Sequence, residues 1–208
     1  MDRMVVEDMK DEIEAKFINS NHDSIRERLR NLGAVCEQPM RMMRRVVIHS
    51  SEMSKKNAFI RIRDEGYRCT MTYKQFDEDS VNGAKEYEIT VSDFDEAVAI
   101  LSQGGLTYDT YQESKRENWV LGDVEIMLDE WPWLNPYIEI EGPSEESVKE
   151  TAERLGMDWN DAVYGGIANV YHIQYPSIGR EGVQTINHGW SEIRFSDPIP
   201  PLLSELAD

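Results

Sequence analysis

The sequence contains only two cysteines, Cys36 and Cys69, and they lack the close pairing that is typical of zinc sites. This argues against a disulfide-stapled fold and favours reduced thiols in a cytoplasmic protein. No apolar run approaches the ~20 residues that a membrane-spanning helix needs. The first residues, MDRMVVEDMKDE, contain no apolar core of a signal peptide. We therefore expect a cytoplasmic protein that does not enter a membrane.

Basic residues are also scarce. The chain has 22 lysines and arginines against 40 aspartates and glutamates, which gives a net charge of −18. A field of this sign repels nucleic acids and anionic membranes, so we expect neither as a partner. It also repels phosphorylated small molecules. Such a protein can bind a polyanion only where its basic residues are concentrated locally or where divalent metal ions assist.

The sequence is rich in short segments with alternating polar and apolar residues. Its 208 residues are 40% hydrophobic and 30% charged, as in a soluble globular domain. Strands are expected at 11–18, 39–49, 84–91 and 137–142, with hairpins over 58–76 and 111–131. Helices are expected at 21–34, 92–105 and 143–157, with a weaker pattern over 160–175. Short connections favour antiparallel pairing, so the predicted fold is α+β, an eight-stranded antiparallel β-barrel with helices packed outside.

The composition changes at Pro176, where proline, glycine and serine become frequent and periodicity is lost. We therefore expect one barrel domain over residues 1–175 and a partly ordered C-terminal extension over 176–208.

Charged side chains recur at alternate positions of the predicted strands. DEIEAK, FIRIRD, KEYEIT and YIEIEG each place long charged residues on one face and apolar residues on the other. A single strand of this kind is typical of a solvated sheet surface. Taken together, the strands differ in the sign of their charge and carry little threonine. This combination fits a barrel with an inverted lining, charged inside and apolar outside beneath the helices.

These motifs, in this order, resemble the CYTH family of triphosphate tunnel metalloenzymes. The residues that carry the resemblance are EIEAK, an RIR segment before TYK, EYE after it, a basic pair, LDE and EIEG. The family includes class IV adenylyl cyclases, thiamine triphosphatases and inorganic triphosphatases. The resemblance implies an eight-stranded barrel whose interior is a charged tunnel, and a small-molecule triphosphate as the ligand.

The resemblance also implies roles for individual residues. Arginine and lysine match phosphoryl oxygens, so the expected phosphate-binding residues are Lys16, Arg61, Arg63, Lys74 and Arg116. Carboxylates are hard ligands for Mg²⁺ or Mn²⁺, and the expected metal ligands are Glu12, Glu14, Asp129, Glu139 and Glu141. Direct catalytic roles are expected for Lys16, Glu86 and Arg116, with Glu88 in support. These acids outnumber these bases, so the empty lining would repel its substrate without metal.

Two segments depart from the family pattern. MMRRVVIH stands where many relatives have an acidic and aromatic strand. Its Arg44 and Arg45 either extend the phosphate site or form a basic outer face, and we favour the outer face. The basic pair is SKR, so Arg116 keeps its register and Lys115 points to the opposite face.

Three functions remain open at this point. We favour metal-dependent hydrolysis of inorganic triphosphate, thiamine triphosphate or a nucleoside triphosphate. The first alternative is a class IV adenylyl cyclase that makes cyclic AMP from ATP. The second is a non-catalytic polyphosphate-binding protein, which would be expected to lose the metal-binding acids. A homodimer is compatible with any of the three.

Overall fold

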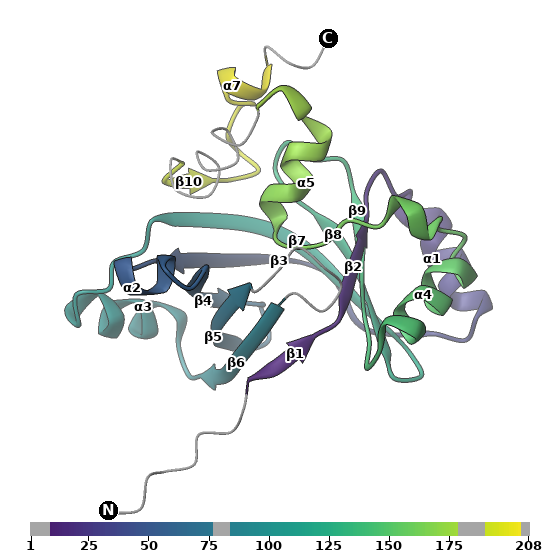
Figure 1. The fold of residues 1–208 in the computed structure, drawn as a ribbon, viewed down its shortest axis with the longest axis horizontal. Coiled ribbons are helices and arrows are strands. Elements are labelled where there is room, and N and C mark those ends of the chain that lie inside the picture. Colours follow the sequence, from purple (N-terminus) through teal and green to yellow (C-terminus); the bar gives the residue numbers. More distant parts are fainter. Residues whose placement is uncertain (1–8, 77–83, 179–189, 205–208) are drawn as a thin grey trace, which may run out of the picture.

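The computed structural model describes residues 9–76, 84–178 and 190–204. Ten strands form one sheet among these residues. Their bounds are Lys10–Glu12 (β1), Glu14–Phe17 (β2), Val35–Ile48 (β3), Ala58–Asp64 (β4), Cys69–Phe76 (β5), Ala84–Val91 (β6), Thr110–Leu121 (β7), Val124–Glu130 (β8), Tyr137–Glu141 (β9) and Glu192–Ile193 (β10). The order is β1-β6-β5-β4-β3-β7-β8-β9-β2, with β10 beside β7 (Figure 1).

The sheet closes on itself through the N-terminal strand. β1 pairs with β6 and β2 pairs with β9, both antiparallel, and only Ile13 separates β1 from β2. The two short strands are thus halves of the single strand predicted over 11–18. The predicted α+β fold, an antiparallel β-barrel with helices packed outside, is confirmed, and the structure shows that the barrel is nearly closed.

Helices cover the outside of this barrel. The bounds of the α-helices are His22–Asn31 (α1), Ser51–Ser54 (α2), Phe94–Gln103 (α3), Glu145–Arg154 (α4), Ile167–Gln174 (α5) and Pro201–Ser204 (α7). Short 3₁₀ turns lie at Trp159–Asp161 and Pro176–Ile178. The side chains of Asp93 and Ser144 cap α3 and α4.

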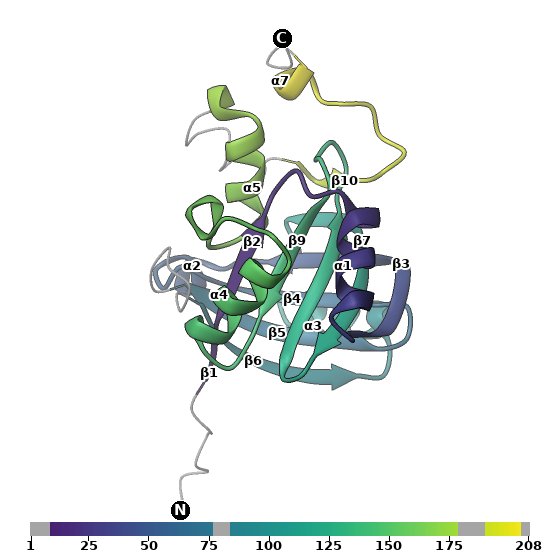
Figure 2. The ribbon, with the colours of Figure 1, turned by 90° about the vertical axis from the view of Figure 1, so that its right-hand side faces the viewer.

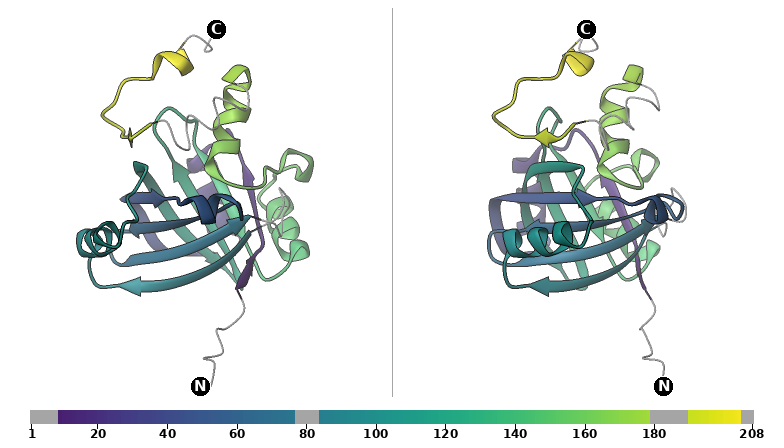
Figure 3. Two further views of the ribbon diagram at one scale, coloured as in Figure 1. Left: turned by 60° about the vertical axis from the view of Figure 1, so that its left-hand side comes forward. Right: turned by 90° about the vertical axis from the view of Figure 1, so that its left-hand side faces the viewer.

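The apolar core lies outside the barrel wall. Ala15 of β2 is fully buried in a cluster with Leu29 of α1 and with Val148 and Leu155 at α4. Figure 2 shows α1 and α4 against the part of the barrel formed by β2, β8 and β9. On another side, α3 lies across β4 and β5 (Figure 3) and buries Phe94 against Ile62. The apolar faces of β2, β4 and β9 therefore turn outward, which leaves their charged faces for the interior.

The longest strand, β3, carries an irregularity near Pro39. Its pairing with β7 shifts register between Cys36 and Gln38 and again between Gln38 and Arg41. Proline cannot donate to the ladder, which accounts for a break at this point. Beyond the break, β3 pairs regularly with β7 on one side and with β4 on the other.

The C-terminal segment, residues 190–204, packs against the barrel and α5. β10 runs parallel to β7, and Ile193 and Leu203 are buried with Tyr171 of α5. The Nε1 of Trp133 donates to the carbonyl oxygen of Asp197 at 3.0 Å. This described part of the predicted extension is therefore built into the fold. Within the described residues, no helix is long and apolar enough to cross a membrane.

Candidate functional site: a polarised tunnel

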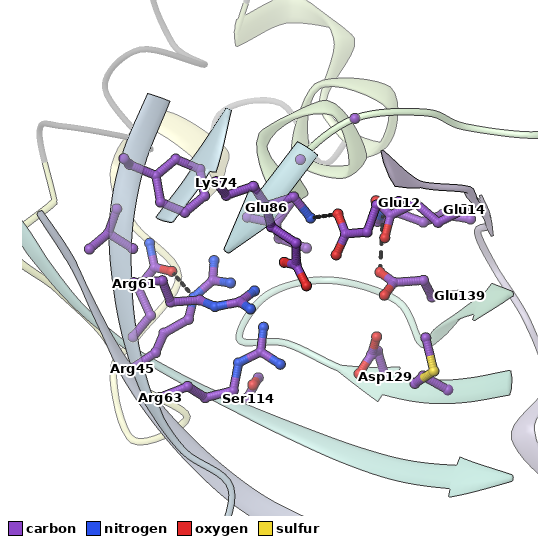
Figure 4. A pocket seen from close by; sticks show the side chains of 18 of the residues that line it. Glu12, Glu14, Arg45, Arg61, Arg63, Lys74, Glu86, Ser114, Asp129 and Glu139 are labelled. Atoms are coloured by element: carbon purple, nitrogen blue, oxygen red, sulfur yellow. Dashed lines mark hydrogen bonds and ion pairs between the residues drawn. The ribbon is translucent and has the colours of Figure 1, made fainter. Parts of the chain in front are cut away.

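One cavity of about 640 Å³ runs through the interior of the barrel. Its described lining includes nine acidic and eight basic side chains besides a histidine. The two signs are separated within it. Figure 4 shows Arg45, Arg61 and Arg63 together on one side, with Glu12, Glu14 and Glu139 opposite. The expectation of a charged interior is thus confirmed, and the charges form two walls.

The basic wall comes from two neighbouring strands. Arg45 of β3 stands directly opposite Arg63 of β4, and Arg61 lies two residues before Arg63 on the same face. Alternation along a strand and direct pairing across strands therefore bring three guanidinium groups together. We call these three residues the arginine cluster.

The arginine cluster has few counter-charges. Arg61 lies 3.4 Å from a carboxylate oxygen of Glu88, and Arg63 lies 3.4 Å from one of Glu65. Arg45 has neutral partners: its Nε donates to Gln112 at 2.7 Å, and its guanidinium carbon lies 4.5 Å from the ring centroid of Trp131.

This environment is unfavourable for positive charge. Burial and the neighbouring Arg61 and Arg116 lower the pKa of Arg63 to about 10. Burial and the charges of Arg63 and Arg61 lower the pKa of Arg45 well below its usual value. The Nε of Arg61 is buried and has no hydrogen-bond partner among the described residues. Buried donors and uncompensated positive charge suit an anion that would occupy the cavity.

The acidic wall comes from the strands that close the barrel. Glu14 of β2 stands directly opposite Glu141 of β9, and Glu12 lies on the same face. Each of the three offers an oxygen, and these oxygens lie within 4.8 Å of one another. Burial and the charges of Glu12 and Glu139 raise the pKa of Glu141 to about 8. Burial and Glu139 likewise raise the pKa of Glu14. Carboxylates crowded together in this way either keep protons or attract a compensating cation.

Some of that compensation comes from lysines. Lys16 lies 2.5 Å from Glu14 and 3.2 Å from Glu139, and Lys74 is paired with Glu12. Burial lowers the pKa of Lys16, but Glu139 and Glu14 outweigh it, so the net shift is upward. These ion pairs place Lys16 and Lys74 beside the acidic wall.

Arg116 of β7 is held in a bidentate pair. Its Nε and Nη2 donate to the two oxygens of Asp129 at 2.7 and 2.6 Å, and Nη2 also contacts Glu139 at 3.3 Å. Burial opposes its charge, yet Asp129 and Glu139 raise its pKa well above the usual value. Burial acts against the charge of Glu139 too, but Lys16 and Arg116 lower its pKa overall. Asp129 and Glu139 are therefore already engaged with cations of the chain.

Glu86 lies between the two walls (Figure 4). Burial and the charge of Glu12 raise its pKa to about 7. One of its carboxylate oxygens is buried without a hydrogen-bond partner among the described residues. Its neighbour on the same face, Glu88, instead accepts a hydrogen bond from Thr72 at 2.7 Å. The pKa of Glu86 therefore lies near neutral pH, as does that of Glu141.

All the predicted site residues line the cavity. Of the five predicted phosphate-binding residues, Arg61 and Arg63 belong to the arginine cluster, whereas Lys16, Lys74 and Arg116 are paired with acids. The five predicted metal ligands also divide. Glu12, Glu14 and Glu141 converge, whereas Asp129 and Glu139 contact Arg116.

The outer-face interpretation was wrong for Arg45, which lines the cavity. It was right for Arg44, which contacts Asp64 at 3.1 Å and lies over the ring of Phe94 on the outside. Pairing with Arg63 decides the direction of Arg45, and that pairing is known only once the sheet order is known. Lys115 contacts Glu130 at 3.0 Å and does not line the cavity, as its register predicts.

A scan against family models matches the CYTH domain to residues 10–161 of this chain. The chain belongs to the CYTH family. The match covers the barrel and ends before α5. Among curated proteins, no sequence matches this CYTH chain.

Solved structures with the same fold span several organisms. A "putative adenylate cyclase" from Vibrio parahaemolyticus has a TM-score of 0.68 and 12% identity, covering 78% of this chain and 98% of its own. PH1012 from Pyrococcus horikoshii OT3 has a TM-score of 0.61 and 22% identity, with coverages of 73% and 93%. HpAC1 from Hippeastrum, a "putative adenylyl cyclase" with a dominant triphosphatase activity, has a TM-score of 0.53 and 14% identity, with coverages of 92% and 98%. At these low sequence identities, the structural similarity establishes a shared fold and nothing further.

CYTH enzymes use divalent metals, and the residues present fit one. Glu12, Glu14 and Glu141 supply oxygen donors, the type that Mg²⁺ and Mn²⁺ prefer. Electrostatics is the second indication: burial, and after it the crowding of negative charge, raises the pKa of Glu14 and that of Glu141. Lys74 and Lys16 now neutralise part of this charge, so a bound cation would compete with or displace them.

Proposed function

We propose that this protein hydrolyses a triphosphate in a metal-dependent reaction inside the tunnel. The observation that carries the proposal is the separation of charge across one cavity. The arginine cluster, short of counter-ions, faces the wall that carries Glu12 and Glu14 (Figure 4). Oxygens of these two acids converge with one of Glu141. A triphosphate can span such a space, with its oxygens on the arginines and its metal ions on the carboxylates. Membership of the CYTH family supports a triphosphate ligand.

Each wall has a distinct task in this proposal. Arg45, Arg61 and Arg63 hold phosphoryl oxygens and favour the charge that develops on them in the transition state. Glu12, Glu14 and Glu141 would hold the metal, which supplies charge neutralisation and polarises a phosphoryl oxygen.

The remaining predicted residues either transfer a proton or hold other side chains in position. Glu86, with a pKa of about 7, accepts a proton from the water that attacks the terminal phosphorus. The bond from that phosphorus to the bridging oxygen breaks, and the products are phosphate and the diphosphate that remains. Arg116 and Lys16 fix Glu139 in place through their ion pairs, and both line the cavity that would hold the phosphate chain. Glu88 orients Arg61.

The test is to incubate the purified protein with Mg²⁺ or Mn²⁺ and with inorganic triphosphate, thiamine triphosphate or ATP. The products are resolved as phosphate, diphosphate and cyclic AMP. We expect release of phosphate that stops when the metal is chelated. Cyclic AMP and diphosphate as the main products would make the protein a cyclase instead. Binding without turnover, with either metal, would make it a triphosphate-binding protein.

A further inference from the structure

At one end of the tunnel, the lining changes from charged to aromatic. On one face of β4, Arg63, Arg61 and then Phe59 line the cavity. On β5, Lys74 is followed on the same face by Phe76. Successive residues on one face of a strand are ~7 Å apart. The aromatic rings therefore lie one step beyond the groups that would hold the phosphate chain.

The rings form a row across three neighbouring strands. The ring centroids of Phe59 and Phe76 are 6.1 Å apart, and those of His49 and Phe59 are 5.9 Å apart. The Nδ1 of His49 lies 2.7 Å from a carboxylate oxygen of Asp109, which restrains the imidazole. All three rings line the cavity.

Packing of the protein core does not account for this row. Phe59 and Phe76 belong to none of the apolar core clusters found among the described residues, and both keep part of their surface exposed. The start of α5 lies next to Phe76. A β-carbon placed on Gly166 would be 3.8 Å from the ring of Phe76, and Gly166 itself lines the cavity.

We propose that Phe59 and Phe76, with His49 beside them, bind the aromatic ring of an organic triphosphate. This inference rests on the proposed function and narrows its substrate class from any triphosphate to an ester that carries a planar heteroaromatic group. A nucleotide base and the rings of thiamine share that chemistry. The arginine cluster would hold the phosphates while the rings hold the organic part.

The polar groups at this opening favour stacking as the mode of recognition. The hydroxyl of Ser54 donates to the carbonyl oxygen of Ser50 at 3.0 Å, and the amide of Asn57 donates to that of Phe76 at 3.2 Å. These donors are engaged with the backbone. We therefore expect the site to select for an aromatic ring and to discriminate weakly between rings.

The experiment compares kcat/KM for ATP, thiamine triphosphate and inorganic triphosphate in wild-type protein, Phe59→Leu and Phe76→Leu. Leucine keeps an apolar side chain and removes the ring. We expect kcat/KM for an organic triphosphate to fall about tenfold more than that for inorganic triphosphate, mainly through KM. This corresponds to ~1.4 kcal/mol, within the range for stacking of one base. Phe59→Trp, which keeps an aromatic ring at this position, should keep the wild-type ratio of kcat/KM between organic and inorganic triphosphates. The ATP and thiamine arms identify which ring the site prefers.

The matched control is Tyr108→Ala, which removes an exposed aromatic ring that does not line the cavity and should leave all three activities unchanged. Equal losses for the organic and inorganic substrates in Phe59→Leu and Phe76→Leu would overturn the inference while the triphosphatase proposal stands. A wild-type preference of more than about tenfold for inorganic triphosphate over both esters would do the same. Failure of wild-type protein to bind or hydrolyse any of the three, checked by titration calorimetry, would overturn both proposals.

Discussion

Replacing Arg63 with methionine should stabilise the protein when no ligand is bound. The pKa of Arg63 falls from 12.5 to about 10 on folding, because of burial and the nearby arginines. Each pKa unit corresponds to ~1.4 kcal/mol, so the charged form costs the folded protein roughly 3 kcal/mol at neutral pH. Methionine keeps most of the aliphatic volume and removes the charge. Glu65 loses a contact at 3.4 Å but keeps Arg68 at 2.9 Å. We expect a net gain of about 1–3 kcal/mol in unfolding free energy.

The same substitution at Arg116 should have the opposite sign. Arg116 is held by two hydrogen bonds to Asp129, which is itself completely buried. Removing the guanidinium leaves an uncompensated carboxylate in the interior, which typically costs about 3–5 kcal/mol. Arg116→Met is therefore the matched control: it makes an identical chemical change on the lining of the same cavity.

Urea denaturation without divalent metal or phosphate measures both effects. Both variants should lose triphosphatase activity, Arg63→Met by about a hundredfold or more in kcat, because a donor to the transition state is missing. Stability and activity would thus move in opposite directions in Arg63→Met and in the same direction in Arg116→Met. If Arg63→Met is destabilised as much as Arg116→Met, the arginine cluster is a structural network and the argument for an anion site is refuted.

Three further predictions concern the acids and the C-terminal segment. In the double variant Glu12→Gln, Glu14→Gln, the turnover rate should fall by at least about a hundredfold, since amides are poor ligands for Mg²⁺. The circular dichroism spectrum should stay unchanged. Near-normal rates would show that neither acid belongs to the metal site. In metal-free protein, the pKa values of Glu86, about 7, and Glu141, about 8, are raised, so above pH ~4.5 the folded state binds more protons than the unfolded state. The unfolding free energy should therefore fall by a few kcal/mol between about pH 5 and pH 9. Melting temperatures that stay constant or rise over this window would contradict the crowding of these carboxylates. Deletion of residues 190–208 should lower the melting temperature and speed amide hydrogen exchange in α5, because buried contacts with α5 are lost. Unchanged exchange in α5 would show that this segment does not stabilise the helix.

The barrel could be predicted because its strands and caps are encoded locally. Alternation marks β4, β5 and β9, and Ser144 with acids in the first turn marks α4. Other features depend on distant partners. β3 begins at Val35, in a stretch with no alternation, because β7 is available to pair with it. The helix α2 is one turn long, too short to show a period.

The site could be predicted in its residue types but only partly in its arrangement. Alternation assigns Arg61 and Arg63 to one face because isoleucines occupy the other. The same reasoning is ambiguous for Arg45, since Val46, Val47 and Ile48 are apolar on both faces. The ion-pair partner of each charged residue could not be predicted from the sequence either. Nothing local indicates that Arg116 meets Asp129, which requires the register of β7 against β8.

The separation of the two walls follows from how the barrel closes. The acids lie on the N-terminal strand and on β9, which are far apart in the chain and become neighbours only at the closure. The arginine cluster lies on β3 and β4, which are consecutive and pair elsewhere around the barrel. Closure therefore gathers like charges on each wall, which folding would otherwise avoid. This arrangement would let a protein of net charge −18 bind a polyanion. Its basic groups are concentrated in the interior, where solvent screens charges least, and cations neutralise the acidic wall opposite.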